Sequence, residues 1–218
     1  MAVKMLKLRS RKEWLEKRKS YIGGSEASCI VGMNPYQTNV DLWELKTGRR
    51  QPQDLSGNPF VEYGRNAEEY LRELFKLDFP KYEVDYVDNN LWINDRYPFA
   101  HASLDGWLTD ELGRFGVLEI KTTNILQSIQ KEKWDHRIPS NYYCQAIWYM
   151  AIVEADFLVL KAQLKYDYSG EVFLNTKHYI IEREEVQEDI DYLMEQGRNF
   201  GECIKNDTRP ALVLPEFG

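Results

Sequence analysis

The sequence predicts an α/β or α+β domain in which helices pack on a central mixed β-sheet. Helical periodicity and strand-like segments succeed one another along the chain, which is the order expected for such layered folds. Two strand-like segments at 100–108 and 116–121 flank a turn at residues 110–113 and predict an antiparallel hairpin. A largely apolar helix, two more strands and an amphipathic helix follow this hairpin.

The first third of the chain carries helix signals. Ser10 is placed as the N-cap of the first helix, with Glu13 three residues later to complete a capping box. Gly23 and Gly24 separate the first helix from the second, and Gly48 ends the third. The four predicted helices span residues 10–19, 25–31, 40–47 and 60–77. The long fourth helix has an apolar stripe made of Ala67, Tyr70, Leu71, Leu74 and Phe75.

The rest of the chain carries the strands. Pro139 stands in the first turn of an apolar helix over 139–152, where its missing N–H costs nothing. Residues 168–170 form a turn between two strands. The predicted strands cover 82–93, 100–108, 116–121, 157–164 and 172–181. We expect a single domain over residues 1–218, with a core at about 10–182 and a C-terminal amphipathic helix at about 184–204, clearest to 199.

Composition excludes several classes of protein. The chain has 218 residues, 43% of them hydrophobic and 29% charged, which is ordinary for a globular protein and unlike a disordered one. No apolar run approaches the roughly 18 residues of a membrane span, so we expect no membrane association and a cytoplasmic location. The three cysteines and three histidines are scattered, which argues against a zinc site or a disulfide framework.

The charge is unevenly distributed. The net charge of −7 argues against a surface covered with phosphate-binding groups. Residues 1–20, however, carry eight basic side chains against two acidic ones, while 182–195 are strongly acidic. The basic segment is therefore a candidate for binding phosphate, and a solvated helix face is its ordinary alternative.

The residues with most chemical information lie on the predicted hairpin. Glu119 and Lys121 are two residues apart on one strand, so their side chains share a face, and the hairpin brings Asp105 close to Glu119. Two neighbouring carboxylates repel, and a divalent cation removes that conflict. A lysine beside them can orient water or stabilise charge on a phosphate. The set suits metal-assisted phosphodiester hydrolysis, although spacing alone also fits an amphipathic strand pair with a surface salt bridge.

The same residues resemble a known nuclease core. Asp105, thirteen intervening residues and the sequence Glu119-Ile120-Lys121 resemble the PD-(D/E)XK core, with Leu104 where that name has proline. Further motifs resemble YqaJ-type viral recombinases, relatives of the phage lambda exonuclease. They are WLEKR at 14–18, IGGSEAS at 22–28, GRNAE at 64–68, ASLDG at 102–106 and the segment 139–145.

The resemblance implies a restriction-endonuclease-like fold and a role for each matching residue. Asp105, Glu119 and the Ile120 carbonyl would bind metal, with Glu68 as an additional acidic ligand and Lys121 as the catalytic lysine. Gln145 matches a glutamine near the active site. The residues that match a 5′-phosphate site are Arg18, Ser25 and Ser103.

Elementary geometry supports some of these roles and leaves alternatives open. On a helical wheel at roughly 100° per residue, Glu68 falls at the edge of the apolar stripe and Glu69 on the solvent side. A buried Gln145 needs a partner, which a structural hydrogen bond to the backbone would also supply. The alternative role of Ser25 is to cap a helix, and that of Ser103 is to form a cross-strand hydrogen bond. Arg18 and Glu68 have the alternative of being ordinary solvated side chains.

The resemblance also implies a reaction and its partners. We expect a Mg²⁺-dependent exonuclease, with Mn²⁺ as a possible substitute, that resects double-stranded DNA ends from 5′ to 3′ and leaves 3′ single strands for recombination. A homotrimeric ring, a single-strand annealing protein as partner, and a phage or prophage gene acting in a bacterial host are implied too. The alternatives are an endonuclease of restriction or repair type and a non-catalytic module that binds DNA ends.

Overall fold

The computed structural model describes residues 2–55 and 57–214, and its centre is a five-stranded mixed sheet. The strand order is β3-β6-β7-β8-β9, in which β7 and β8 are parallel and the other neighbours antiparallel. These strands are β3 (Glu83–Asp85), β6 (Gly106–Thr109), β7 (Phe115–Ile125), β8 (Phe157–Tyr168) and β9 (Glu171–Glu182). The predicted mixed sheet and the predicted antiparallel hairpin are confirmed, and the two strands on either side of the predicted turn at 168–170 also pair antiparallel.

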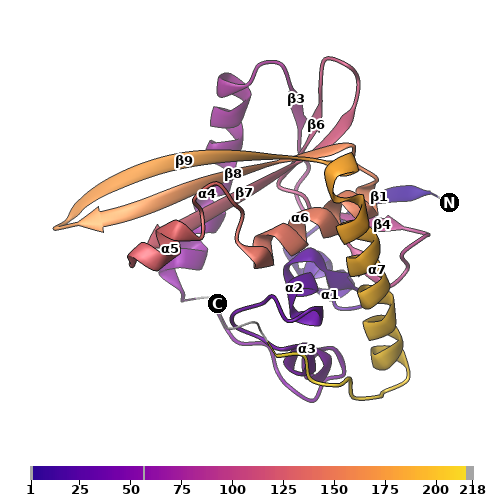
Figure 1. Ribbon diagram of the computed structural model, residues 1–218. Helices are drawn as coiled ribbons and strands as arrows, with labels where there is room; N and C mark the ends of the chain where they lie inside the picture. The colour runs from indigo at the N-terminus through magenta and orange to yellow at the C-terminus, as the bar shows by residue number, and fades with distance from the viewer. Residues whose placement is uncertain (1, 56, 215–218) are drawn as a thin grey trace.

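Helices cover both faces of this sheet (Figure 1). On one face lies α4, whose Leu71 and Phe75 pack against Leu118 and Ile120 of β7. On the other face lies α6, which is buried along most of its length and packs with α2 and α7 in the larger core. The helices are α1 (Arg11–Arg18), α2 (Gly24–Ile30), α3 (Asn39–Lys46), α4 (Pro59–Asp78), α5 (Ser128–Glu132), α6 (Ser140–Val153) and α7 (Arg183–Lys205).

Two small sheets flank the central one. The strands β1 (Val3–Lys7) and β4 (Asn90–Asn94) pair antiparallel, and β2 (Ile22–Gly23) pairs in parallel with β5 (Ala100–His101). The sequence prediction contained neither β1 nor β2, and it treated the Gly23-Gly24 pair only as a break. Both are short strands whose partners lie more than 70 residues away in the chain, so local periodicity gives no signal for them.

Two predicted strands are wrong because each is divided by a loop. The segment 82–93 splits into β3 and β4, which belong to different sheets, and Asn89 in the loop has a positive φ of 53°. The segment 100–108 splits into β5 and β6 because Asn90 binds both backbone groups of Leu104 between them. Asp105 therefore lies in the loop just before β6 and not within a long strand.

Smaller corrections concern the helices. Tyr70 and Leu74 are exposed, so the apolar stripe of α4 is narrower than predicted, and Arg72 is buried in their place. Ser10 does cap α1 through the Glu13 N–H, but the Glu13 carboxylate accepts from Arg9 rather than completing the predicted box. The sequence prediction also lacked α5, whereas α7 ends at Lys205, close to the predicted end at about 204.

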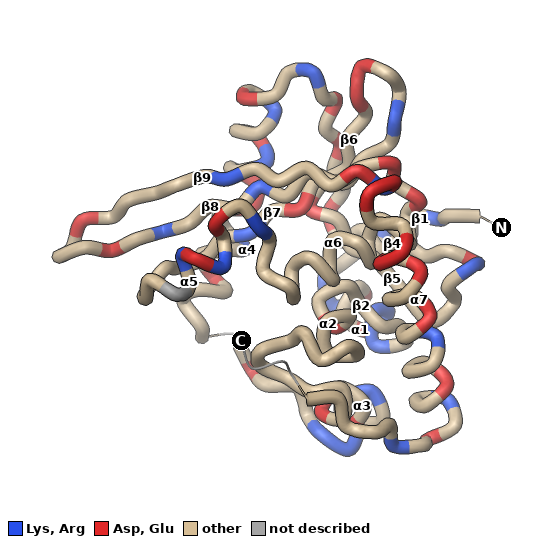
Figure 2. The backbone as a smooth tube through the Cα atoms, viewed as in Figure 1, with Lys and Arg blue, Asp and Glu red and all other residues tan. Residues whose placement is uncertain are grey.

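The distribution of charge along the chain agrees with the prediction. The first half of α7 gathers acidic side chains, whereas basic side chains predominate along α1 (Figure 2). Within residues 2–55 and 57–214, no helix is both long and apolar enough to cross a membrane. Cys29, Cys144 and Cys203 are free thiols, and the first two are buried.

Gly116, near the start of β7, lies where the central sheet is closely packed. A Cβ added there would lie 2.4 Å from the Phe157 ring, and Phe157 is itself fully buried. We expect Gly116→Ala to lower the free energy of unfolding by about 1–3 kcal/mol through overpacking, measured by denaturant unfolding. Gly57→Ala is the control, since a Cβ at Gly57 has nothing within 4 Å. Equal stability of the two variants would contradict this packing.

Candidate active site

Asp105 and Glu119 lie beside each other where β6 and β7 begin to separate. Gly106 pairs with Leu118 in the antiparallel register, so Asp105 is opposite Glu119 at the next position. One Asp105 carboxylate oxygen, Oδ2, accepts a hydrogen bond of 2.8 Å from the Ile120 N–H. The loop before β6 thus holds the Asp105 side chain against the backbone of the strand that carries the Glu-Ile-Lys sequence.

Glu119 is the most buried of the acidic candidates, with 1% of its surface exposed. Its Oε1 atom accepts a hydrogen bond of 2.7 Å from Gln145 Nε2 on α6 and lies 2.5 Å from Lys121 Nζ. Among the described residues, its second oxygen, Oε2, has no hydrogen-bond partner. A buried carboxylate oxygen without a partner is costly, so Oε2 is a free ligand position.

Glu68 comes from α4 and lines the same pocket as Asp105. It is partly buried, whereas Glu69 is exposed, a difference in burial that the helical wheel predicts, although both residues line the pocket. Arg72, one turn later and only 5% exposed, lies 3.3 Å from a Glu68 oxygen and donates a 2.5 Å hydrogen bond to the Asp105 main-chain carbonyl. Arg72 therefore connects the helix that carries Glu68 to the loop that carries Asp105.

The electrostatics of this cluster favour added positive charge. Burial, followed by repulsion from Asp105, raises the pKa of Glu119 to about 8 and that of Glu68 to about 7. Burial also raises the pKa of Asp105. Burial alone would lower the pKa of Lys121, but the charges of Glu119 and Asp105 raise it above the usual value. Lys121 is therefore a cation, and one ammonium is set against three carboxyl groups.

This donor set fits a hard divalent cation. It offers the free Oε2 of Glu119, the Asp105 carboxylate beside it and the backbone oxygen of Ile120, all of them oxygen ligands of the kind that Mg²⁺ binds together with water. Within the described part of the chain, no three His, Cys, Asp or Glu side chains already converge closely enough to hold a metal. Two carboxylates with a carbonyl and water would meet the requirement instead.

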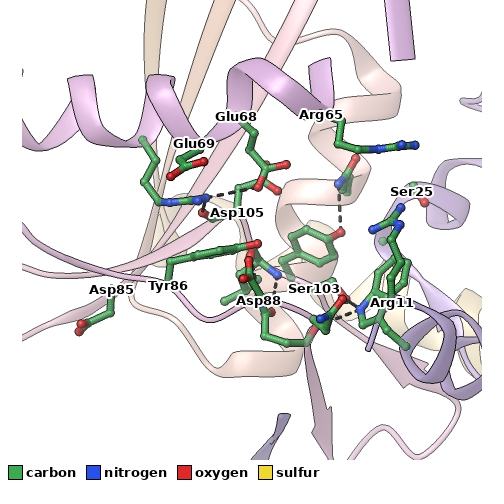
Figure 3. Close-up of a pocket in the computed structure, with 18 of the residues that line it drawn as sticks. Arg11, Ser25, Arg65, Glu68, Glu69, Asp85, Tyr86, Asp88, Ser103 and Asp105 are labelled. Atoms are coloured by element: carbon green, nitrogen blue, oxygen red, sulfur yellow. Dashed lines mark hydrogen bonds and ion pairs between the residues drawn. The ribbon is translucent and has the colours of Figure 1, made fainter. Parts of the chain in front are cut away.

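A pocket of about 910 Å³ opens beside the cluster and contains the candidate phosphate-binding residues (Figure 3). Arg18, Ser25 and Ser103 all line it, together with Glu68, Asp105 and Gln145. Ser103 accepts from the Trp14 indole N–H and donates to the Asn90 carbonyl, so its hydroxyl also has a structural role. The structure thus brings Glu68, Asp105 and Gln145 to the same cavity as the predicted phosphate-binding residues, whereas Glu119, Ile120 and Lys121 are not among the residues that line it.

Sequence reasoning missed several residues that line the same pocket. They are Arg11, Trp14, Arg65, Arg72, Tyr86, His101 and Tyr149. Spacing could have indicated three of them: Arg11 precedes Arg18 by two helical turns, and Arg65 and Arg72 flank Glu68 on α4. His101 carries no such signal. It is buried beside Arg18 and Lys46, its ring nitrogens have no partner among the described residues, and burial lowers its pKa to about 3.

Comparison with known proteins places this site in a family context. The family model described as the YqaJ-like viral recombinase domain matches residues 13–156, a range that contains every candidate site residue. The uncharacterized protein YqaJ of Bacillus subtilis is 30% identical over 148 residues, which are 68% of this chain and 44% of that protein. The chain therefore spans less than half the length of this relative.

Solved structures share the fold at low sequence identity. The alkaline exonuclease LHK-Exo from Laribacter hongkongensis is 16% identical, with a TM-score of 0.61 over 91% of this chain and 96% of that one. Its complex with dAMP gives a TM-score of 0.62 at the same identity and coverage. A phage-related exonuclease from Haemophilus somnus is 13% identical, with a TM-score of 0.53 over 86% and 96%. These likenesses confirm the predicted α/β fold.

Proposed function

Because the chain belongs to the YqaJ-like viral recombinase domain family, we propose that it is a metal-dependent exonuclease acting on double-stranded DNA ends. It would hydrolyse one strand from 5′ to 3′ and leave a 3′ single strand for recombination. The observation that carries this proposal is the buried cluster of Asp105, Glu119 and Lys121, with one Glu119 oxygen free of any partner among the described residues. The solved structures that share this fold include exonucleases, which agrees with the proposal.

Asp105, Glu119, the Ile120 carbonyl and Glu68 would hold the metal, for which Mg²⁺ is the natural choice and Mn²⁺ a substitute. When bound, such an ion lowers the pKa of a bound water and neutralises charge on the phosphate. Gln145 would keep Glu119 in place through its 2.7 Å hydrogen bond. Lys121, protonated beside Glu119, would stabilise the negative charge that grows on the phosphate and orient the attacking water.

The pocket beside the cluster would hold the end of the cleaved strand. The Arg18 guanidinium can bind a phosphate through two parallel hydrogen bonds, and Ser25 and Ser103 offer hydroxyl groups on the same lining. A 5′-terminal phosphate anchored there would place the next phosphodiester bond toward Asp105 and Glu119. LHK-Exo, which shares the fold, has been crystallised in complex with dAMP, which agrees with nucleotide binding.

Assembly and partners belong to the same proposal. A homotrimeric ring with basic surfaces turned inward would reconcile the net charge of −7 with DNA binding, and a single-strand annealing protein would take the 3′ strand. The enzyme would act in the cytoplasm of a bacterial host. Light scattering should give three times the mass of one chain, and a monomer would remove the ring.

Closed circular DNA separates this proposal from its endonuclease alternative. We expect the protein with Mg²⁺ to degrade a linear duplex and to leave a covalently closed circle of the same sequence intact, because the pocket accepts a strand end. Agarose gels over a time course give the result. Nicking or linearisation of the circle at the rate of linear degradation would show an endonuclease instead.

Metal binding should depend on pH because Glu119 and Glu68, whose pKa values are raised, must lose their protons before they can bind a cation. A ligand carboxylate has to lose its proton first, and these two groups remain largely protonated below about pH 7 to 8 in the free protein. The increase in Tm on adding Mg²⁺ should therefore be larger at about pH 9 than at about pH 6. Thermal unfolding with Mg²⁺ or EDTA measures it. An equal increase at both pH values would exclude these carboxylates as the ligands.

A further inference from the structure

Three arginines converge on the active-site pocket from two helices. Arg11 and Arg18 are two turns apart on α1, and their guanidinium groups lie 5.0 and 4.5 Å from the centre of the Trp14 ring between them in sequence. Trp14 is almost fully buried and is fixed by hydrogen bonds from its indole N–H. The ring therefore holds both guanidinium groups in place along the same pocket lining.

Arg65 approaches from α4. In Figure 3, Arg65, Ser25 and Arg11 lie on one side of the pocket, with Glu68, Glu69 and Asp105 on the other. Partial burial of the guanidinium group lowers the pKa of Arg11, and the charges of Arg65 and Arg18 lower it further, whereas the charge of Glu68 raises it. In the described part of the chain, none of the three arginines has a hydrogen bond or an ion pair with a carboxylate. Like charges that gather without a direct ion pair favour an anionic ligand.

The three arginines differ in depth. Arg18 is half-buried and close to Gly23 and His101, at the inner part of the pocket, whereas Arg11 and Arg65 are exposed. The inner position suits a terminal phosphate, which ends the strand. The exposed position suits a phosphate from which the DNA chain continues in both directions.

We propose that Arg11 and Arg65 together bind an internal backbone phosphate of the DNA, at a second site distinct from the one proposed for the 5′-terminal phosphate. This inference rests on the proposed action on DNA ends. One guanidinium group from α1 and one from α4 would clamp that phosphate between them. The contact reads no base sequence and would fix the register of the strand relative to Asp105 and Glu119.

Salt dependence of binding tests the second site. The double variant Arg11→Gln/Arg65→Gln should bind a duplex end about tenfold more weakly in EDTA, where no hydrolysis occurs. The slope of log affinity against log salt concentration should decrease by about the amount expected for the loss of one phosphate contact. The loss should be the same for 5′-phosphate and 5′-hydroxyl ends, whereas Arg18→Gln should weaken only the phosphorylated end. Fluorescence anisotropy with labelled duplexes provides both readouts.

Lys12→Gln/Lys17→Gln is the matched control, because it removes two exposed positive charges from α1 that do not line the pocket. Equal losses in the two double variants would overturn the inference in favour of general charge. A loss confined to 5′-phosphorylated ends would also overturn it, by assigning Arg11 and Arg65 to the terminal site. A wild-type protein that binds no duplex end would overturn the proposed function as well, which keeps the two failures distinct.

Discussion

Lys121→Met is expected to lower kcat for nucleotide release by about 100- to 1,000-fold. Methionine preserves the length of the side chain but removes the ammonium group that lies 2.5 Å from Glu119. Without that charge, the phosphate loses a preorganised electrostatic contact that matters most in the transition state, so kcat should fall and KM change little. Initial rates on a linear 5′-phosphorylated duplex at saturating Mg²⁺ measure the effect.

Two controls accompany this variant. The Lys121→Met variant breaks a buried ion pair that also contributes to the local structure. Thermal unfolding is therefore needed to show that the variant remains folded. Lys165→Met, on the neighbouring strand β8, removes a lysine that packs on Tyr63 and should retain nearly the wild-type rate. A Lys121→Met protein with kcat within about threefold of wild type would exclude Lys121 from the chemical step.

Asp105→Asn is expected to reduce the rate by about 100-fold or more at ordinary Mg²⁺ concentrations. The amide keeps the shape of the side chain, and its oxygen can still accept from the Ile120 N–H, but the negative charge that attracts the metal is lost. Raising the Mg²⁺ or Mn²⁺ concentration should recover part of the activity, because the defect lies in metal affinity. A metal titration of the rate separates this effect from a general loss of activity.

Asp85→Asn is the matched control, since Asp85 is an exposed carboxylate at the edge of the same pocket on β3. It should show the wild-type metal dependence. If Asp105→Asn also required no more metal than wild type, Asp105 would not be a ligand, and its place beside Ile120 would be purely structural.

The hairpin and the placement of its polar side chains could be predicted because both depend on local spacing. The two-residue separation of Glu119 and Lys121 fixes a common face of β7, and the turn before β7 fixes Asp105 opposite Glu119. The helical period likewise distinguished Glu68 from Glu69. These predictions needed no knowledge of contacts between distant parts of the chain.

The parts that sequence reasoning missed depend on long-range contacts. Asn90 divides a predicted strand by binding the backbone of Leu104, and this side chain gives no sign of that role in its local sequence. The sequence gives Arg72 the pattern of a solvated helix residue, but in the structure it donates a hydrogen bond to the Asp105 main-chain carbonyl. The sequence indicates only that Trp14 belongs to an amphipathic helix. In the structure its indole N–H donates a hydrogen bond to Ser103, and its ring makes cation–π contacts with two arginines. Each of these residues acts through a partner from another element.

The most direct test of the proposed function follows the release of nucleotides from a linear duplex with 5′-phosphate ends and a label at either the 5′ or the 3′ end. With Mg²⁺, the protein should release the 5′ label first as a mononucleotide, leave the 3′ label on a shortening strand, and stop when EDTA is added. No release with Mg²⁺ or Mn²⁺, by a protein shown to be folded, would contradict the exonuclease and favour a module that only binds DNA ends.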